Sequence, residues 1–205
     1  MNTKYNLLLT DSLKYSITKI LPGIMGLISV ILIIKMIGTE EYGKYSILNS
    51  FIMTLTAFSG GWLNQSLLRY YPGNNVRKKI ENQAFLCLII SAALGILILL
   101  GIYIIKRDSF FQHANTLLVI FFYVAVLLYQ FEISVYRSQI RPNMVILISS
   151  IQSILALIMP LFFIYYFGSK VKYIILGLSI AYLVPNIKNL LFKIFSIQRI
   201  LQFKK

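Results

Sequence analysis

Residues 38–72 read GTEEYGKYSILNSFIMTLTAFSGGWLNQSLLRYYP, and this stretch decides which kind of fold the chain can adopt. An acidic turn at residues 38–43 opens a long apolar segment that ends on Arg69. The Ser59-Gly60-Gly61 sequence predicts a break within this segment, because glycine weakens the interior of a helix. The segment also contains three amide side chains: Asn49, Asn64 and Gln65. A soluble domain would hold the segment as a half-polar helix, whereas a membrane would use it as a polar span that lines a path.

The composition of the whole chain selects the membrane alternative. Of its 205 residues, 58% are hydrophobic and 13% are charged, and the mean hydropathy is +0.77. Soluble domains carry about a quarter charged residues. The apolar residues occur in blocks of about 20, the length that crosses ~30 Å of hydrocarbon as a helix at ~1.5 Å per residue. The blocks do not alternate as the strands of a β-barrel do, so we expect an all-α, polytopic membrane protein.

Six such blocks predict six transmembrane helices. Their approximate bounds are residues 17–37, 45–68, 85–105, 116–135, 144–167 and 173–195. Only short connections separate them, so residues 1–205 should form a single transmembrane domain without an extramembrane catalytic domain. The first block is too long for the core of a signal peptide and has no small-x-small cleavage site, so we expect it to remain as a helix.

The distribution of basic residues predicts the orientation in the membrane. An even number of spans puts both termini on one face, and that face holds fourteen of the 20 lysines and arginines, against six on the other. Because basic residues favour the cytoplasmic side, we expect both termini on the cytoplasmic face of the cytoplasmic membrane. The net charge of +14 then reflects this topology and contact with anionic membrane lipids. Nucleic acid is not an expected partner, because the basic residues lie at the ends of spans.

Few residues of the kinds that carry chemistry occur in the chain. Its single cysteine, Cys87, lies within an apolar span, and its single histidine, His113, lies in an outer loop. A metal or haem site is therefore not expected. The sequence has no phosphate-binding loop, nucleophile elbow or paired-carboxylate motif. We therefore predict no catalytic residues, no cofactor and no enzymatic activity.

Two cations inside the predicted spans are the main candidates for function. Lys19 lies on a polar, small-residue face of the first span, and Arg69 lies near the cytoplasmic end of the second. They would lie at similar depth on adjacent antiparallel helices and could bind a phosphorylated headgroup. Trp62, Asn64 and Gln65 would then be available to stack on a sugar or hydrogen-bond to it. Alternatively, both cations extend to the membrane surface and only anchor their helices.

Two further polar residues have structural as well as functional interpretations. Glu132 is the one acid within the fourth span. It could neutralise Arg137 or Arg69, which we favour, or carry a proton in a coupling cycle. Gln152 and the serines around it form a pattern that more often joins helices than binds a substrate.

The 38–72 stretch resembles the N-terminal region of polysaccharide flippases. These proteins are the O-antigen and teichoic-type translocases of the multidrug/oligosaccharidyl-lipid/polysaccharide exporter superfamily. They carry a Gly-x-x-x-Tyr-Gly turn after the first helix, then a second helix with a late glycine and an arginine. The matching positions in this chain are Gly38, Tyr42, Gly43, Gly61 and Arg69. The short loops, the expected cytoplasmic termini and the span lengths also fit the family.

The resemblance implies a transporter without an ATPase of its own. Members of the family consist of two six-helix lobes, and the central cavity between the lobes opens alternately to the two sides of the membrane. Their cargo is a sugar chain on undecaprenyl diphosphate, and coupling to a proton or sodium gradient is expected of them. This chain would be one lobe of such a transporter, with Arg69 and Lys19 on the diphosphate. It would need a second lobe, from a separate chain or from a second copy in a homodimer.

Two other classes of function stay open from the residues alone. One is a membrane scaffold or assembly subunit of a polysaccharide-synthesis complex, in which the polar residues only join helices. The other is an unrelated six-span carrier or channel.

Overall fold

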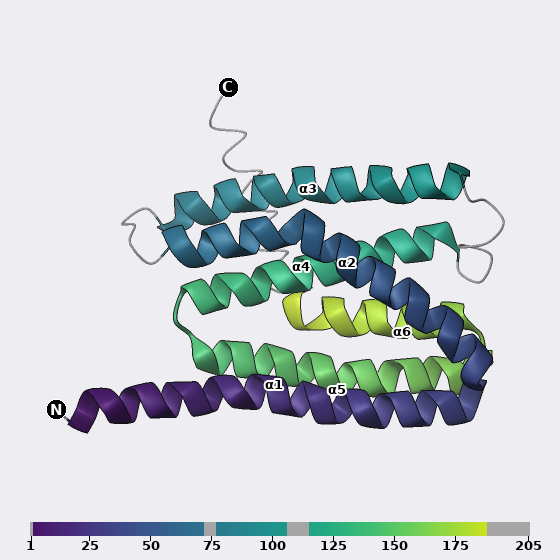
Figure 1. Ribbon diagram of the computed structural model, residues 1–205, viewed down its shortest axis with the longest axis horizontal. Helices are drawn as coiled ribbons and strands as arrows, with labels where there is room; N and C mark the ends of the chain where they lie inside the picture. Colours follow the sequence, from purple (N-terminus) through teal and green to yellow (C-terminus); the bar gives the residue numbers. More distant parts are fainter. Residues whose placement is uncertain (1, 72–76, 106–114, 188–205) are drawn as a thin grey trace.

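The computed structural model describes residues 2–71, 77–105 and 115–187, and these are almost entirely helical (Figure 1). These described residues form six successive α-helices: α1 (Asn2–Ile37), α2 (Thr39–Tyr70), α3 (Arg77–Ile105), α4 (Thr116–Ser138), α5 (Pro142–Phe167) and α6 (Val171–Leu183). One 3₁₀ turn, η1 (Val184–Asn186), continues α6. These residues contain no β-strand, which confirms the all-α prediction.

The helices lie side by side and alternate in direction, so their termini gather at two ends of the bundle (Figure 1). Within the described residues, four helices contain an apolar segment long enough to cross a membrane: Lys19–Ile37 in α1, Ile80–Ile105 in α3, Thr116–Ser138 in α4 and Pro142–Phe167 in α5. Helix α2 is long enough but more polar. The end of the sixth predicted span, and the predicted loop with His113, lie outside the described residues. The chain is therefore a polytopic helical membrane protein.

Helix α4 is the central helix of the bundle. It packs against α2, α3, α5 and α6. In its apolar segment 61% of the residues are buried, against 6% in that of α1. Phe122, Tyr123 and Phe131 are among its almost fully buried side chains. Because lipid tails are as apolar as these side chains, close packing rather than the hydrophobic effect holds such helices together in a membrane.

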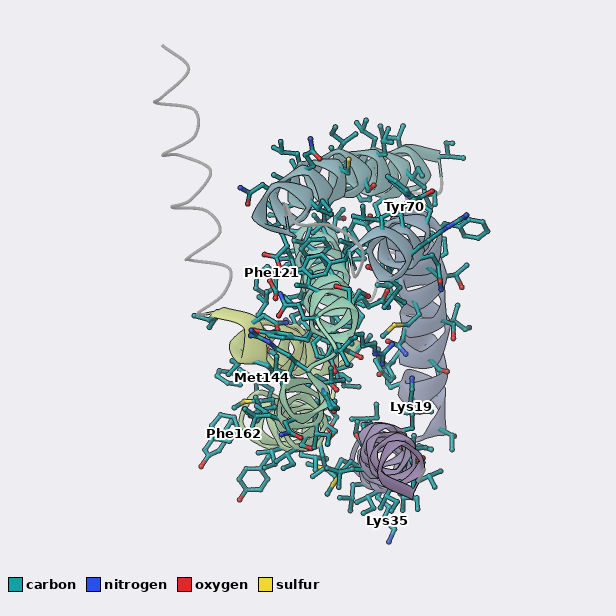
Figure 2. The ribbon with its side chains drawn as sticks, turned by 90° about the vertical axis from the view of Figure 1, so that its left-hand side faces the viewer. Lys19, Lys35, Tyr70, Phe121, Met144 and Phe162 are labelled. Atoms are coloured by element: carbon teal, nitrogen blue, oxygen red, sulfur yellow. The ribbon has the colours of Figure 1, made fainter. Side chains whose placement is uncertain are left out.

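The sharp turn between α1 and α2 depends on Gly38. This residue has a φ of +83°, a backbone conformation that side chains disfavour. Glu40 and Glu41 follow in the first turn of α2, where the helix dipole favours negative charge. Lys44 Nζ donates a hydrogen bond to Glu41 Oε1 (2.8 Å) and lies 2.9 Å from Glu40 Oε1, and these two carboxylates raise the pKa of Lys44. From this turn α1 and α2 diverge, so they are close only at this end of the bundle (Figure 1 and Figure 2).

Helix α2 runs without interruption through Ser59-Gly60-Gly61, so the predicted break is wrong. Gly60 instead lets α2 approach α4, because a Cβ there would lie 2.7 Å from Leu127 Cδ1. The hydroxyls of Thr56 and Ser59 donate to the carbonyls four residues earlier, at 2.7 and 2.8 Å. Bonds of this kind often bend a helix, and α2 changes direction about midway along its length (Figure 1).

A hydrogen-bonded cluster ties three helix ends together at the end of the bundle opposite Gly38. Tyr71 directly follows α2, Glu81 lies in α3, and Gln139 directly follows α4. Tyr71 Oη donates to Glu81 Oε1 at 2.9 Å. Gln139 Nε2 donates to the same carboxylate oxygen at 2.7 Å and to Tyr71 Oη at 3.1 Å. The cluster fixes α2, α3 and α4 relative to one another.

The close contact of α5 and α6 at Gly177 provides a test of the packing. A Cβ at this position would lie 2.5 Å from the backbone nitrogen of Pro160 and 2.7 Å from its Cα. Because backbone atoms cannot rotate away, Gly177→Ala should destabilise the protein by about 1–3 kcal/mol, as overpacking does. Gly101→Ala is the matched control, since a Cβ there meets nothing within 4 Å. Thermal unfolding in detergent should give a lower Tm for Gly177→Ala alone, and equal Tm values for the two variants would contradict this packing.

Candidate functional site

A cleft opens where α1 and α2 diverge from the Gly38 turn. It has a volume of about 420 Å³ and is backed by α4 and α5. Its polar walls come from all four helices: Lys19 of α1, Asn64 and Gln65 of α2, Gln130, Ser134 and Arg137 of α4, and Ser149 and Gln152 of α5. These residues lie toward the end of the bundle that the charge distribution predicts to be cytoplasmic.

Two cations line this cleft. Figure 2 shows the Lys19 side chain pointing from α1 toward the rest of the bundle, whereas Lys35 on the same helix points away from it. Arg137, in the last turn of α4, lines the same cleft. Within the described part of the chain, no carboxylate lines the cleft. Such a lining attracts anions, above all a phosphate or diphosphate, to which both side chains can donate hydrogen bonds.

Neutral amides complete the polar wall. Asn64 and Gln65 come from α2, and Gln152, which is buried, comes from α5. Asn64 Oδ1 is buried and accepts no hydrogen bond within the described part of the chain. An unpaired buried carbonyl oxygen costs about 1–3 kcal/mol. The position therefore favours a water molecule or a ligand group that donates a hydrogen bond.

Gly61 leaves part of the cleft open. A Cβ on the preceding Gly60 would collide with Leu127, but a Cβ on Gly61 would meet nothing within 4 Å. The two adjacent glycines therefore have different consequences. Gly60 lets α2 pack on α4, and Gly61 keeps the α2 wall of the cleft free of a side chain.

The cleft brings together several of the residues singled out from the sequence: Lys19, Gly61, Asn64 and Gln65. Arg69 and Trp62, which were also candidates, do not line the cleft. Arg69 is exposed, and its guanidinium carbon lies 5.5 Å from the centre of the Tyr70 ring. Trp62 is also exposed and lines a separate apolar groove between α2 and α3. Their roles in binding stay predictions.

Arg137 is the second cation of the cleft. From the sequence it is predicted only as a possible partner of Glu132. Its signal in the sequence is the spacing of Gln130, Ser134 and Arg137, which places all three on one face of a helix. Glu132 lies two residues from both Gln130 and Ser134, so helical geometry puts it on the opposite side of α4. It is 3% exposed there. An ion pair with arginine and a proton-carrying role both stay predictions for Glu132.

The other residues of the family motif lie at and just after the turn between α1 and α2, outside the cleft. Gly38 provides the positive φ of the turn. The ring of Tyr42 lies beside that of Tyr45, with 5.6 Å between their centres, and both line a second cavity. Nothing in the structure requires glycine at Gly43, where a Cβ would meet nothing within 4 Å.

Comparison with known proteins agrees with the resemblance found in residues 38–72. The family model described as "Polysaccharide biosynthesis protein" matches residues 8–203, which is nearly the whole chain. No curated protein and no solved structure matches the chain significantly.

The arrangement predicts that the cleft contains water although it lies among membrane-spanning helices. Cys87 is the single cysteine, so a Cys87→Ser background leaves no competing thiol. Lys19→Cys in this background should react with a membrane-impermeant methanethiosulfonate, because the reactive thiolate requires water. Leu27→Cys, on an exposed apolar part of the same helix, should face lipid and stay unmodified. Mass spectrometry after labelling in vesicles measures both, and equal labelling of the two positions would show that the cleft is not the hydrated side of α1.

Proposed function

The chain belongs to the polysaccharide biosynthesis protein family, and we propose that it forms one lobe of a transporter for lipid-linked oligosaccharides. The cargo is a sugar chain on undecaprenyl diphosphate, which passes across the cytoplasmic membrane while its lipid tail stays in the bilayer. The sugar and the diphosphate are polar, and in hydrocarbon each unsatisfied polar group costs several kcal/mol. A transporter lowers this barrier by presenting a polar surface inside the membrane.

The observation that supports this proposal most directly is the cationic cleft between α1 and α2. Lys19 and Arg137 line it together, and both carry several hydrogen-bond donors and no acceptor. A diphosphate offers only acceptor oxygens and negative charge, so it complements this pair. The planar guanidinium of Arg137 can hold two phosphate oxygens at once, and the Lys19 ammonium acts as a point charge.

The divergence of α1 and α2 suits a headgroup that remains attached to a lipid. The two helices meet at the Gly38 turn and are far apart at the opposite end of the bundle (Figure 1 and Figure 2). A diphosphate held in the cleft would therefore stay connected to its hydrocarbon tail through the gap between the helices. A closed ring of helices would not permit this connection.

Transport by alternating access requires a second lobe, on this chain or on another. In the proposal the second lobe covers the open side of the cleft, and the two lobes rock so that the cleft faces first the cytoplasm and then the outer side. The cluster of Tyr71, Glu81 and Gln139 ties together the ends of α2, α3 and α4 that we predict to be cytoplasmic. That part of the lobe would therefore move as one body.

Removal of charge from the cleft distinguishes transport from a scaffolding role. Lys19→Ala and Arg137→Ala should each lower export of lipid-linked oligosaccharide about tenfold or more, because a hydrogen bond to a charged group contributes about 1.5–3 kcal/mol. Arg141→Ala is the control: it removes an exposed arginine at the same end of the bundle and outside the cleft. The measurement is the amount of lipid-linked sugar that remains on the cytoplasmic side in cells with equal protein levels.

The same assay decides between the two candidate arginines. If Arg69→Ala stops export and Arg137→Ala does not, the diphosphate binds at the position expected from the sequence and not in the cleft. Normal export in Lys19→Ala, Arg137→Ala and Arg69→Ala would instead favour a scaffold.

A steric variant tests the cleft without changing its charge. Gly61→Val should lower export, because the added side chain enters a space that no other atom occupies within 4 Å of the Cβ position. Gly101→Val adds the same side chain to α3 at a glycine whose Cβ would also meet nothing within 4 Å, and it should export normally. Equal export by the two variants, at equal protein levels, would mean that the cleft is not on the transport path.

A further inference from the structure

A second cavity adjoins the cationic cleft and lies nearer the Gly38 turn. It has a volume of about 290 Å³. Pro22 and Gln152 line both hollows, so the two are neighbours along the same gap between α1 and the rest of the bundle. On α2 the cleft is lined from Gly61 onward, whereas the second cavity is lined by residues between Tyr42 and Asn49. The second cavity is therefore the deeper of the two, seen from the end that we predict to be cytoplasmic.

The lining of this deeper cavity mixes polar and apolar side chains and, among the described residues, includes no lysine, arginine, aspartate or glutamate. Three serines and the side chains of Asn49, Gln152, Tyr42, Tyr45 and Tyr182 are its polar part. A phosphate group there would find no cation. Amides and hydroxyls both donate and accept hydrogen bonds, and tyrosine adds a flat apolar face to a polar tip. This combination matches a neutral sugar ring, which has hydroxyl groups at its edge and C–H groups on its faces.

Two amide side chains contribute to this polar part. Asn49 lines the cavity, and its buried Oδ1 accepts no hydrogen bond from the described residues, so it is left without a donor. Gln152 lines both hollows and so lies at their boundary, and its helix-joining role stays a prediction. Tyr129 of the cleft and Tyr182 of the deeper cavity lie side by side at the same boundary, with 5.2 Å between ring centres.

We propose that the deeper cavity binds the sugar next to the diphosphate, and that it selects a neutral sugar. This inference rests on the proposed function, because it needs the diphosphate in the cleft beside Lys19 and Arg137. The volume of about 290 Å³ suits a single sugar ring rather than a longer chain. A sugar with a carboxylate would place its charge where no cation lines the wall. Asn49 is the residue of α2 that donates to and accepts from the sugar hydroxyls.

The test compares binding of two ligands to the purified protein in lipid nanodiscs. The ligands are a polyprenyl diphosphate and the same lipid carrying one neutral hexosamine. The wild-type protein should bind the sugar-bearing lipid about tenfold more tightly, and Asn49→Ala should remove most of this preference without changing binding of the sugar-free lipid. Ser50→Ala, at an exposed neighbouring position of α2, should change neither. Asn49→Leu, which fills the cavity instead of emptying it, should give the same loss of preference.

The possible results separate the two proposals. If both Asn49 variants keep the wild-type preference, or weaken the two ligands equally, the deeper cavity is not a sugar site. If Lys19→Ala leaves binding of the sugar-free lipid unchanged, the cleft does not hold the diphosphate and the proposed function fails. A preference for the same lipid carrying a uronic acid over the one carrying the neutral sugar would overturn the selection for neutral sugars.

Discussion

A polar group cannot be left unpaired in hydrocarbon, and this constraint explains most of the structure. It makes the described membrane segments helical, because a helix pairs its backbone internally. It also explains the serine and threonine hydroxyls that bond back to their own helix, as at Thr56, Ser59 and Ser179. Polar side chains that cannot reach their own backbone must face one another or water. Asn49 and Asn64 are such residues. Asn49 lines the deeper cavity, and Asn64 lines the cleft.

Helix α4 separates the packed part of the bundle from the polar part. Phe122, Tyr123 and Phe131 are buried in the core that α4 shares with α2, α3 and α6. Gln130 and Arg137 line the cleft that α1 faces. Helix α1 itself is little buried and packs mainly on α5. Helix α4 therefore presents these apolar side chains to the core and these two polar ones to the cleft.

The sequence predicted the class of fold well because that class depends on composition and block length alone. It also predicted the turn that begins at Gly38, because turn formation depends on local residues. Three of the candidate binding residues from the sequence, Lys19, Asn64 and Gln65, line the cleft. It did not predict how α2 is rotated about its axis. Asn64 and Gln65 line the cleft, whereas Trp62 and Arg69 do not. On the helix Trp62 and Arg69 lie about 140–160° from Asn64 but only about 40–60° from Gln65. Rotation depends on packing against other helices, here on the contact of Gly60 with Leu127, and no periodicity within α2 encodes it. The sequence did not predict that Arg137 lines the cleft for a related reason. That position becomes apparent only when α1 is known to contribute Lys19 to the same cleft.

The order of the two hollows along the bundle has a physical reason in the proposed mode of binding. A cation deep in the membrane is harder to keep charged than one near its surface, so Lys19 and Arg137 lie in the hollow nearer the predicted cytoplasmic end. Neutral amides and tyrosines can lie deeper, because burying them carries no charge penalty once they are hydrogen-bonded. The proposed cargo has the same order of chemistry: a hydrocarbon tail, then a charged diphosphate, then a sugar. A headgroup that enters sugar first would therefore leave its diphosphate at the cations and its tail at the gap between α1 and α2. With the cations deepest, the charged group would instead pass the whole neutral lining before meeting a counter-charge, and the sugar would be left outside the walls that suit it.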